Sequence, residues 1–74
     1  MNHMDHISID YKTMLGKPCI KGTRITVEQI LKKLSEGVSA EVLAESLPSL
    51  TTEDIYAAIA YSADMLKMEE SLAS

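Results

Sequence analysis

Residues 25–55 read ITVEQILKKLSEGVSAEVLAESLPSLTTEDI, and this stretch decides the fold because it contains three helix starts. Each start has a hydroxyl residue that can accept a backbone N–H of the first turn, with apolar residues on either side: Thr26, Ser39 and Thr51. Gln29 and Asp54 stand three residues after two of these caps and complete capping boxes. The pattern predicts three consecutive helices.

The apolar spacing and the breakers agree with these starts. Gly37 is placed to end the first helix, and Pro48 to end the second. The first helix is expected to face the core with Val27, Ile30, Leu31 and Leu34. The second is expected to do so with Val42, Leu43 and Leu47. The joint at Pro48 gives the last two helices the spacing of a helix-turn-helix.

The third helix is expected from Thr52 to about Leu72 and carries two apolar stripes. At about 100° per residue, one stripe serves the core of its own chain, and its members are Ile55, Ile59, Ser62 and Leu66. A second stripe lies about 120° away and consists of Tyr61, Met65, Met68 and Leu72. Two short partner helices leave little to cover it, so contact with another chain is expected, either a symmetric copy or a different protein. The alternative is that Tyr61 and Met65 close the intrachain core while the last turns fray.

Before the helices, Ile7, Ile9 and Tyr11 alternate with polar residues, which is typical of a short half-buried strand. A second extended piece includes Cys19 and Ile20 and could pair with the first as a hairpin. Residues 1–6 are expected to form a flexible tail, and residues 7–74 a single domain. The predicted class is mainly α: a three-helix bundle with a helix-turn-helix, preceded by a short strand or hairpin.

Size and charge narrow the function classes. A chain of 74 residues forms one domain of marginal stability, and its single cysteine excludes an internal disulfide. Residues 1–35 carry six Lys or Arg residues and three acidic residues. Residues 36–74 carry one lysine and eight acidic residues, and the two halves together give the net charge of −4. This division argues against uniform wrapping of nucleic acid. No apolar run reaches the length of a signal peptide or membrane span, so a cytoplasmic location is expected.

The segment at residues 16–25, GKPCIKGTRI, is a basic turn directly before the first helix. If DNA is bound, its backbone phosphates would be contacted by Lys17, Lys21, Arg24, Lys32 and Lys33. The alternative is an ordinary solvated charged face. The third helix is a poor reader of bases, because Glu53 and Asp54 in its first turn would approach the phosphates.

No catalytic or metal-binding set is assembled in the sequence. The order Lys21-Gly22-Thr23 reverses that of a phosphate-binding loop. Cys19 lies beside Ile20 and is expected to be buried rather than nucleophilic. His3 with a free amino terminus could hold copper or nickel, but an ordinary tail histidine is the favoured interpretation. We expect no enzyme activity, no metal and no cofactor.

From residues 16–25 through Gly37, Pro48 and the segment ending at Ala60-Tyr61, the chain resembles the domain of unknown function four hundred and thirty-three family. The resemblance spans about Ile7 to Leu66. It departs from the family pattern at Thr26, where proline is frequent, and at Leu47, where an aromatic residue is usual. The resemblance implies a homeodomain-like helix-turn-helix fold and an antitoxin role of the VapB type, beside a toxin with a PIN-like ribonuclease fold.

The leading hypothesis is a non-enzymatic, homodimeric antitoxin-like protein that masks such a toxin and contacts operator DNA through its basic half. The final helix would cover the toxin's cationic cleft with the second stripe, and its charge partners would be Asp64, Glu69 and Glu70. Two alternatives stay open: a stand-alone DNA-binding regulator, and an interaction or scaffold protein of unknown role.

Overall fold

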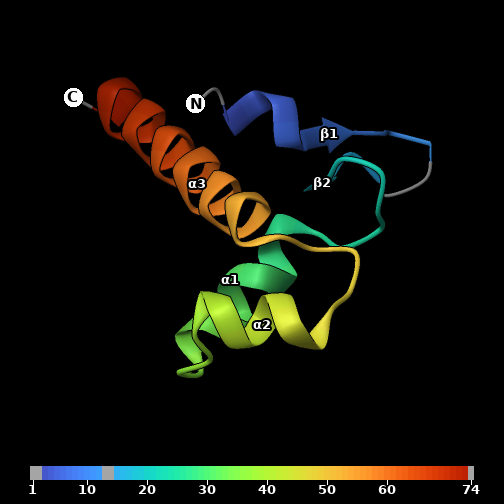
Figure 1. Cartoon of the computed structure of the whole chain (residues 1–74). Helices are drawn as coiled ribbons and strands as arrows, with labels where there is room; N and C mark the ends of the chain where they lie inside the picture. The colour runs from blue at the N-terminus through green and yellow to red at the C-terminus, as the bar shows by residue number, and fades with distance from the viewer. Residues whose placement is uncertain (1–2, 13–14, 74) are drawn as a thin grey trace.

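A computed structural model describes residues 3–12 and 15–73 of the chain, with side chains described for 4–12 and 15–68. Two short strands precede three helices, and the last helix is by far the longest (Figure 1). In chain order the elements are η1 (His3–His6, a 3-10 turn), β1 (Ile7–Ile9), β2 (Pro18–Ile20), α1 (Val27–Ser35), α2 (Ala40–Ser46) and α3 (Thr52–Ala73). The mainly α class with an N-terminal hairpin is thereby confirmed.

All three helix caps form as the sequence predicts. The Thr26 hydroxyl accepts the Gln29 N–H at 3.0 Å, and the Gln29 side-chain oxygen accepts the Thr26 N–H at 2.9 Å. Ser39 accepts only the Val42 N–H, at 3.2 Å. These bonds satisfy N–H groups that have no partner inside a helix, which fixes where each helix begins.

The chain leaves α1 through a glycine. Gly37 has φ +94°, a conformation that side chains with a Cβ rarely adopt. Its N–H donates to the carbonyl of Leu34 at 3.1 Å, and the next N–H, of Val38, donates to Lys33 at 3.3 Å. These bonds satisfy carbonyls of the last turn and end the helix, as the sequence predicts.

The hairpin is antiparallel, with Ile7 opposite Ile20, Ser8 opposite Cys19 and Ile9 opposite Pro18. Beyond β2 the chain makes a turn in which the Ile20 N–H donates to the Ile25 carbonyl at 2.9 Å. The Thr23 hydroxyl donates to the carbonyl of Ile20, also at 2.9 Å. Residues 20–25 are therefore closed into a turn by their own hydrogen bonds, which join the end of β2 to the residue just before the Thr26 cap.

The core lies where the hairpin, α1 and α2 meet the first half of α3. Its centre consists of three isoleucines that are almost fully inaccessible to solvent: Ile20, Ile30 and Ile55. Other buried members come from β1, α1, α2, the loop before α3 and α3 itself, namely Ile7, Val27, Ala40, Leu43, Leu50, Ala58 and Tyr61. At about 1.5–3 kcal/mol for each large side chain, burial of these residues supplies most of the driving force for folding.

Four residues expected to face the core are exposed instead, among them Leu31 of α1 at 36%. Ile59 and Leu66 of α3 are 39% and 62% exposed, and Val42 of α2 is also exposed. Tyr61, by contrast, is buried. The helix is rotated from the expected orientation because β1 and η1 also pack on α3, on the side of Tyr61. The expectation that only another chain could cover Tyr61 is therefore wrong, and the alternative, burial within the chain, holds for that residue.

The N-terminal segment also differs from the expected flexible tail. Residues His3–His6 form the 3-10 turn η1, which lies alongside α3 (Figure 1). The N-terminal end of η1 and the C-terminal end of α3 lie on the same side of the molecule (Figure 1). The apolar periodicity of the sequence indicated no secondary structure for residues 3–6, yet this segment packs against α3.

Candidate interaction surfaces

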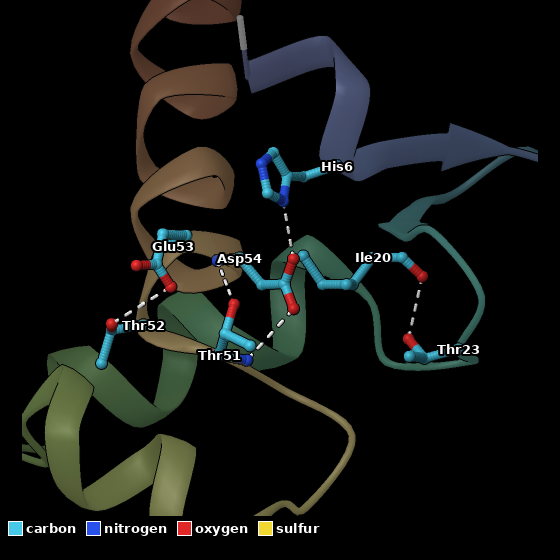
Figure 2. Close-up of polar contacts among 7 residues, drawn as sticks. All are labelled: His6, Ile20, Thr23, Thr51, Thr52, Glu53 and Asp54. Atoms are coloured by element: carbon cyan, nitrogen blue, oxygen red, sulfur yellow. Dashed lines mark hydrogen bonds and ion pairs between the residues drawn. The ribbon is translucent and has the colours of Figure 1, made fainter. Parts of the chain in front are cut away.

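One polar joint ties the N-terminal turn to the start of α3. The Nδ1 atom of His6 lies 2.7 Å from Oδ1 of Asp54 (Figure 2). The other carboxylate oxygen of Asp54 accepts the Thr51 N–H at 3.1 Å, and the Asp54 N–H donates to the Thr51 hydroxyl at 3.1 Å. Asp54 is therefore both the capping-box residue of α3 and the partner of a histidine 48 positions earlier.

These contacts set the acidity of Asp54. Burial of the carboxyl group alone would raise its pKa, because it disfavours the charged form. Hydrogen bonds from His6 and from the backbone and side chain of Thr51 outweigh that effect, and they lower the pKa of Asp54 below its ordinary 3.8. The carboxylate is accordingly charged near neutral pH, where it complements the positive end of the helix dipole.

An open apolar groove of about 610 Å³ lies between the N-terminal elements and the second half of α3. Met4 of η1 and Ile9 of β1 form one side. Residues of α3 form the other: Tyr61, Asp64, Met65, Lys67 and Met68. We call this surface the Met65/Met68 groove.

Most of the predicted partner stripe lines this groove. Tyr61 contributes only its small exposed part, since it is 9% accessible, whereas Met65 and Met68 are 39% and 57% accessible. The side chain of Leu72 lies outside the described residues, as do those of Glu69 and Glu70. The structure therefore places two exposed methionines where the sequence predicts four anchors.

The five cations predicted to contact DNA are all exposed, and they come from the hairpin, the basic turn and α1. Lys17 and Lys33 are engaged with acidic neighbours, Glu28 at 3.4 Å and Glu36 at 3.9 Å respectively. Within the part of the chain that the structure describes, Lys21, Arg24 and Lys32 form no ion pair. These three are the cations that could meet a phosphate without first losing an acidic partner.

The helix-turn-helix pair itself offers little to a base edge. Exposed residues at the start of α3 include Glu53 and Tyr56, and the Tyr56 hydroxyl lies 3.5 Å from a carboxylate oxygen of Glu41 in α2. Glu53 and Glu41 are both acidic, so this surface would repel the phosphates beside a major groove. The geometry agrees with the sequence argument that α3 does not read bases.

A second hollow, of about 580 Å³, lies between α1 and α2. Its floor is apolar and is made by residues such as Ile30, Leu43 and Leu47. Lys32 and Lys33 stand at its edge. Two of the predicted DNA-contact residues therefore border a surface that is itself apolar.

Of the remaining candidates, the side chain of His3 lies outside the described residues, and Cys19 has a structural role. Cys19 is buried, and its thiol donates weakly to the Lys17 carbonyl at 3.4 Å. Among residues 3–12 and 15–73, no group of three or more His, Cys, Asp or Glu side chains is arranged to hold a metal ion. Of the helices in that same part of the chain, none combines the length and apolar character needed to span a bilayer.

The sequence interpretation missed one surface. Tyr56, Ile59 and Leu66 are exposed, and Ala63 between them is exposed too. At about 100° per residue these four positions fall within about 80° on α3, so they form one apolar face, here called the Tyr56/Leu66 face. The i, i+3, i+7, i+10 spacing was visible in the sequence, but Ile59 and Leu66 had been assigned to the core.

Comparisons with known proteins give one result. A family model described as "Protein of unknown function (DUF433)" matches residues 7–62, which includes the hairpin, α1, α2 and the first half of α3. No curated protein and no solved structure shows a significant match. Since the model covers well over half of the 74 residues, the chain belongs to the DUF433 family.

Proposed function

We propose that this chain is a non-enzymatic, antitoxin-like protein that binds and masks a PIN-like ribonuclease toxin through the second half of α3. The observation that carries the proposal is the Met65/Met68 groove, in which two methionines stay exposed on a helix that extends past α1 and α2 (Figure 1). Methionine is flexible and polarizable, and it is common on surfaces that bind other proteins.

The chemistry of the helix supports a cationic partner. From Asp64 to the end of the chain there are three acidic residues and one lysine. The active cleft of a ribonuclease must attract RNA phosphates, so it offers positive charge that such a helix can neutralise. Apolar anchors surrounded by complementary charge are the usual arrangement of a protein interface.

Co-purification with the product of the adjacent gene, followed by titration calorimetry with that product, tests this proposal. The wild-type chain should bind one ribonuclease and inhibit RNA cleavage. Met65→Glu with Met68→Glu should weaken binding by about 100-fold or more, because it places charge in the apolar contact. Leu15→Glu is the matched control: Leu15 is 87% exposed and lies outside α3, so binding should not change. An unaltered affinity of the double variant would contradict the proposed surface.

A second candidate function is DNA binding, favoured by the unpaired state of Lys21, Arg24 and Lys32 in the described structure. Contacts would be made to phosphates, and the logarithm of the affinity should fall linearly with the logarithm of salt concentration. Lys21→Ala with Arg24→Ala should reduce that slope by about 1.8, at about 0.9 per lost phosphate contact. Absence of binding to operator fragments at low salt would remove this function.

The two functions are compatible in one molecule. The cations lie on the hairpin, the basic turn and α1, whereas the groove lies between the N-terminal elements and the second half of α3. Operator DNA and the ribonuclease would both meet the chain in the cytoplasm, and neither role requires catalysis, a metal or a cofactor. The antitoxin proposal includes a homodimer.

A further inference from the structure

We infer that a second copy of this chain packs on the Tyr56/Leu66 face, so that two α3 helices lie antiparallel about a two-fold axis. This assigns the homodimer to a surface on a different side of α3 from the Met65/Met68 groove. The inference concerns the isolated chain and does not rest on toxin binding.

The Tyr56/Leu66 face has the exposed apolar side chains and the small residue that are typical of a helix–helix interface. Three large apolar side chains are substantially exposed on it, while Ala63 between them allows a second backbone to approach. From Tyr56 to Leu66 the face extends about 15 Å along the helix.

A second copy is favoured as the partner of this face because large and small side chains of the two copies would face each other. In an antiparallel register that sets Tyr56 opposite Leu66 of the second copy, Ile59 comes opposite Ala63 of that copy. A large side chain then meets a small one twice, since a two-fold interface repeats each contact. Packing of large against small side chains is what allows helices to approach closely.

The charges complement each other in the same register. Glu53 and Lys67 are exposed and lie on the same flank of the face, about 21 Å apart along the helix at 1.5 Å per residue. The two-fold axis brings Glu53 of one copy beside Lys67 of the other, and the same pair forms at the opposite end. A parallel arrangement would place like charges together, so these residues select the antiparallel one.

This dimer also explains why α3 is poorly suited to recognise DNA bases. Tyr56 and Ile59 lie in the half of α3 that a helix-turn-helix would insert into the major groove. With that half covered by the second copy, DNA would have to be contacted through the hairpin, the basic turn and α1, where the cations are. The dimer would leave Met65 and Met68 of both grooves accessible to other partners, and of the groove residues it would engage Lys67.

Sedimentation equilibrium of the full chain tests the inference. The expected mass is twice 8.1 kDa. Leu66→Glu should raise the dimer Kd by at least about tenfold. Met68→Glu is the matched control, because Met68 is similarly exposed on the same helix but belongs to the groove, and its dimer Kd should stay within about twofold of wild type. Helical content by circular dichroism checks that each variant is folded.

Charge reversal tests the register. Glu53→Lys and Lys67→Glu should each weaken the dimer several-fold, and the double variant should restore it, because the ion pairs re-form with exchanged signs. A monomeric wild-type chain at millimolar concentration would overturn the inference, as would dissociation by Met68→Glu but not by Leu66→Glu. Toxin binding fails or succeeds independently: Met68→Glu should impair it, and Leu66→Glu should not.

Discussion

His6 and Asp54, 48 positions apart, are joined by a contact of 2.7 Å between Nδ1 and Oδ1. The contact connects the N-terminal turn to the first turn of α3, and both side chains are largely shielded from solvent. It lies at the base of the region where η1 runs along α3 toward the Met65/Met68 groove. The position of Met4 in that groove therefore depends on a bond made at the opposite end of η1.

Replacing His6 with alanine should lower the free energy of unfolding by about 1 kcal/mol, because the largely shielded carboxylate of Asp54 loses one hydrogen-bond partner but keeps Thr51. Urea denaturation followed by circular dichroism measures the change. Asp5→Ala, which alters an exposed residue of the same turn, is the control and should have little effect. A His6→Ala variant as stable as wild type would show that the contact does not hold η1 on α3.

Acid should destabilise the chain through Asp54. Its folded pKa is below 3.8, whereas the unfolded value is about 3.9. The unfolded state therefore binds the proton more readily, so the stabilisation is complete above about pH 5 and is lost as pH falls through 3.9 to the folded pKa. Asp54→Asn should be less stable than wild type at pH 7 and should lose less stability between pH 5 and pH 3. An NMR titration midpoint of the Asp54 carboxyl above 3.8 would contradict this.

The three caps should not contribute equally. Thr26 is buried and makes a reciprocal capping box, so Thr26→Ala should cost about 1–2 kcal/mol. Ser39 is exposed and accepts a single bond, so Ser39→Ala should cost about 0.5–1 kcal/mol. Thermal unfolding of both variants gives the comparison. Thr26→Ala keeps the backbone N–H that donates to Gln29, so equal losses would mean that the burial of Thr26 adds nothing to its cap.

Two isoleucines four residues apart on α3 test its orientation. Ile55 is fully buried, so Ile55→Val should cost about 0.5–1.5 kcal/mol. Ile59 is 39% exposed, so Ile59→Val should cost less than about 0.5 kcal/mol when unfolding is measured at concentrations where the chain is monomeric. The reverse order would show that Ile59, and not Ile55, points into the core.

Local sequence signals predicted the local structure well. Hydroxyl residues at Thr26, Ser39 and Thr51 predicted the helix starts because a cap needs only residues within one turn of itself. Gly37 ended α1 for the same reason. Alternation at Ile7, Ile9 and Tyr11 predicted the first strand, but the strand ends at Ile9 and only Ile7 of the three is buried. The pairing with the second extended piece, which the sequence left open, forms as an antiparallel hairpin.

The orientation of α3 was not predicted, because periodicity shows that two stripes exist but not which neighbours cover them. Residues 1–6 lacked any apolar period, so they were interpreted as a tail, and Met4 and His6 were not considered as partners of α3. Once η1 is known to pack there, Tyr61 becomes a core residue while Ile59 and Leu66 become exposed. The candidate surfaces changed accordingly.

The sequence by itself determined the order of the strands and α-helices, the starts of those helices, the division of charge and the absence of a disulfide framework. Each of these depends on residue type or on spacing within a few positions. Only the tertiary structure decided which side of α3 meets solvent. That outcome depends on contacts across 48 or more positions, such as His6 with Asp54, and no local pattern encodes them.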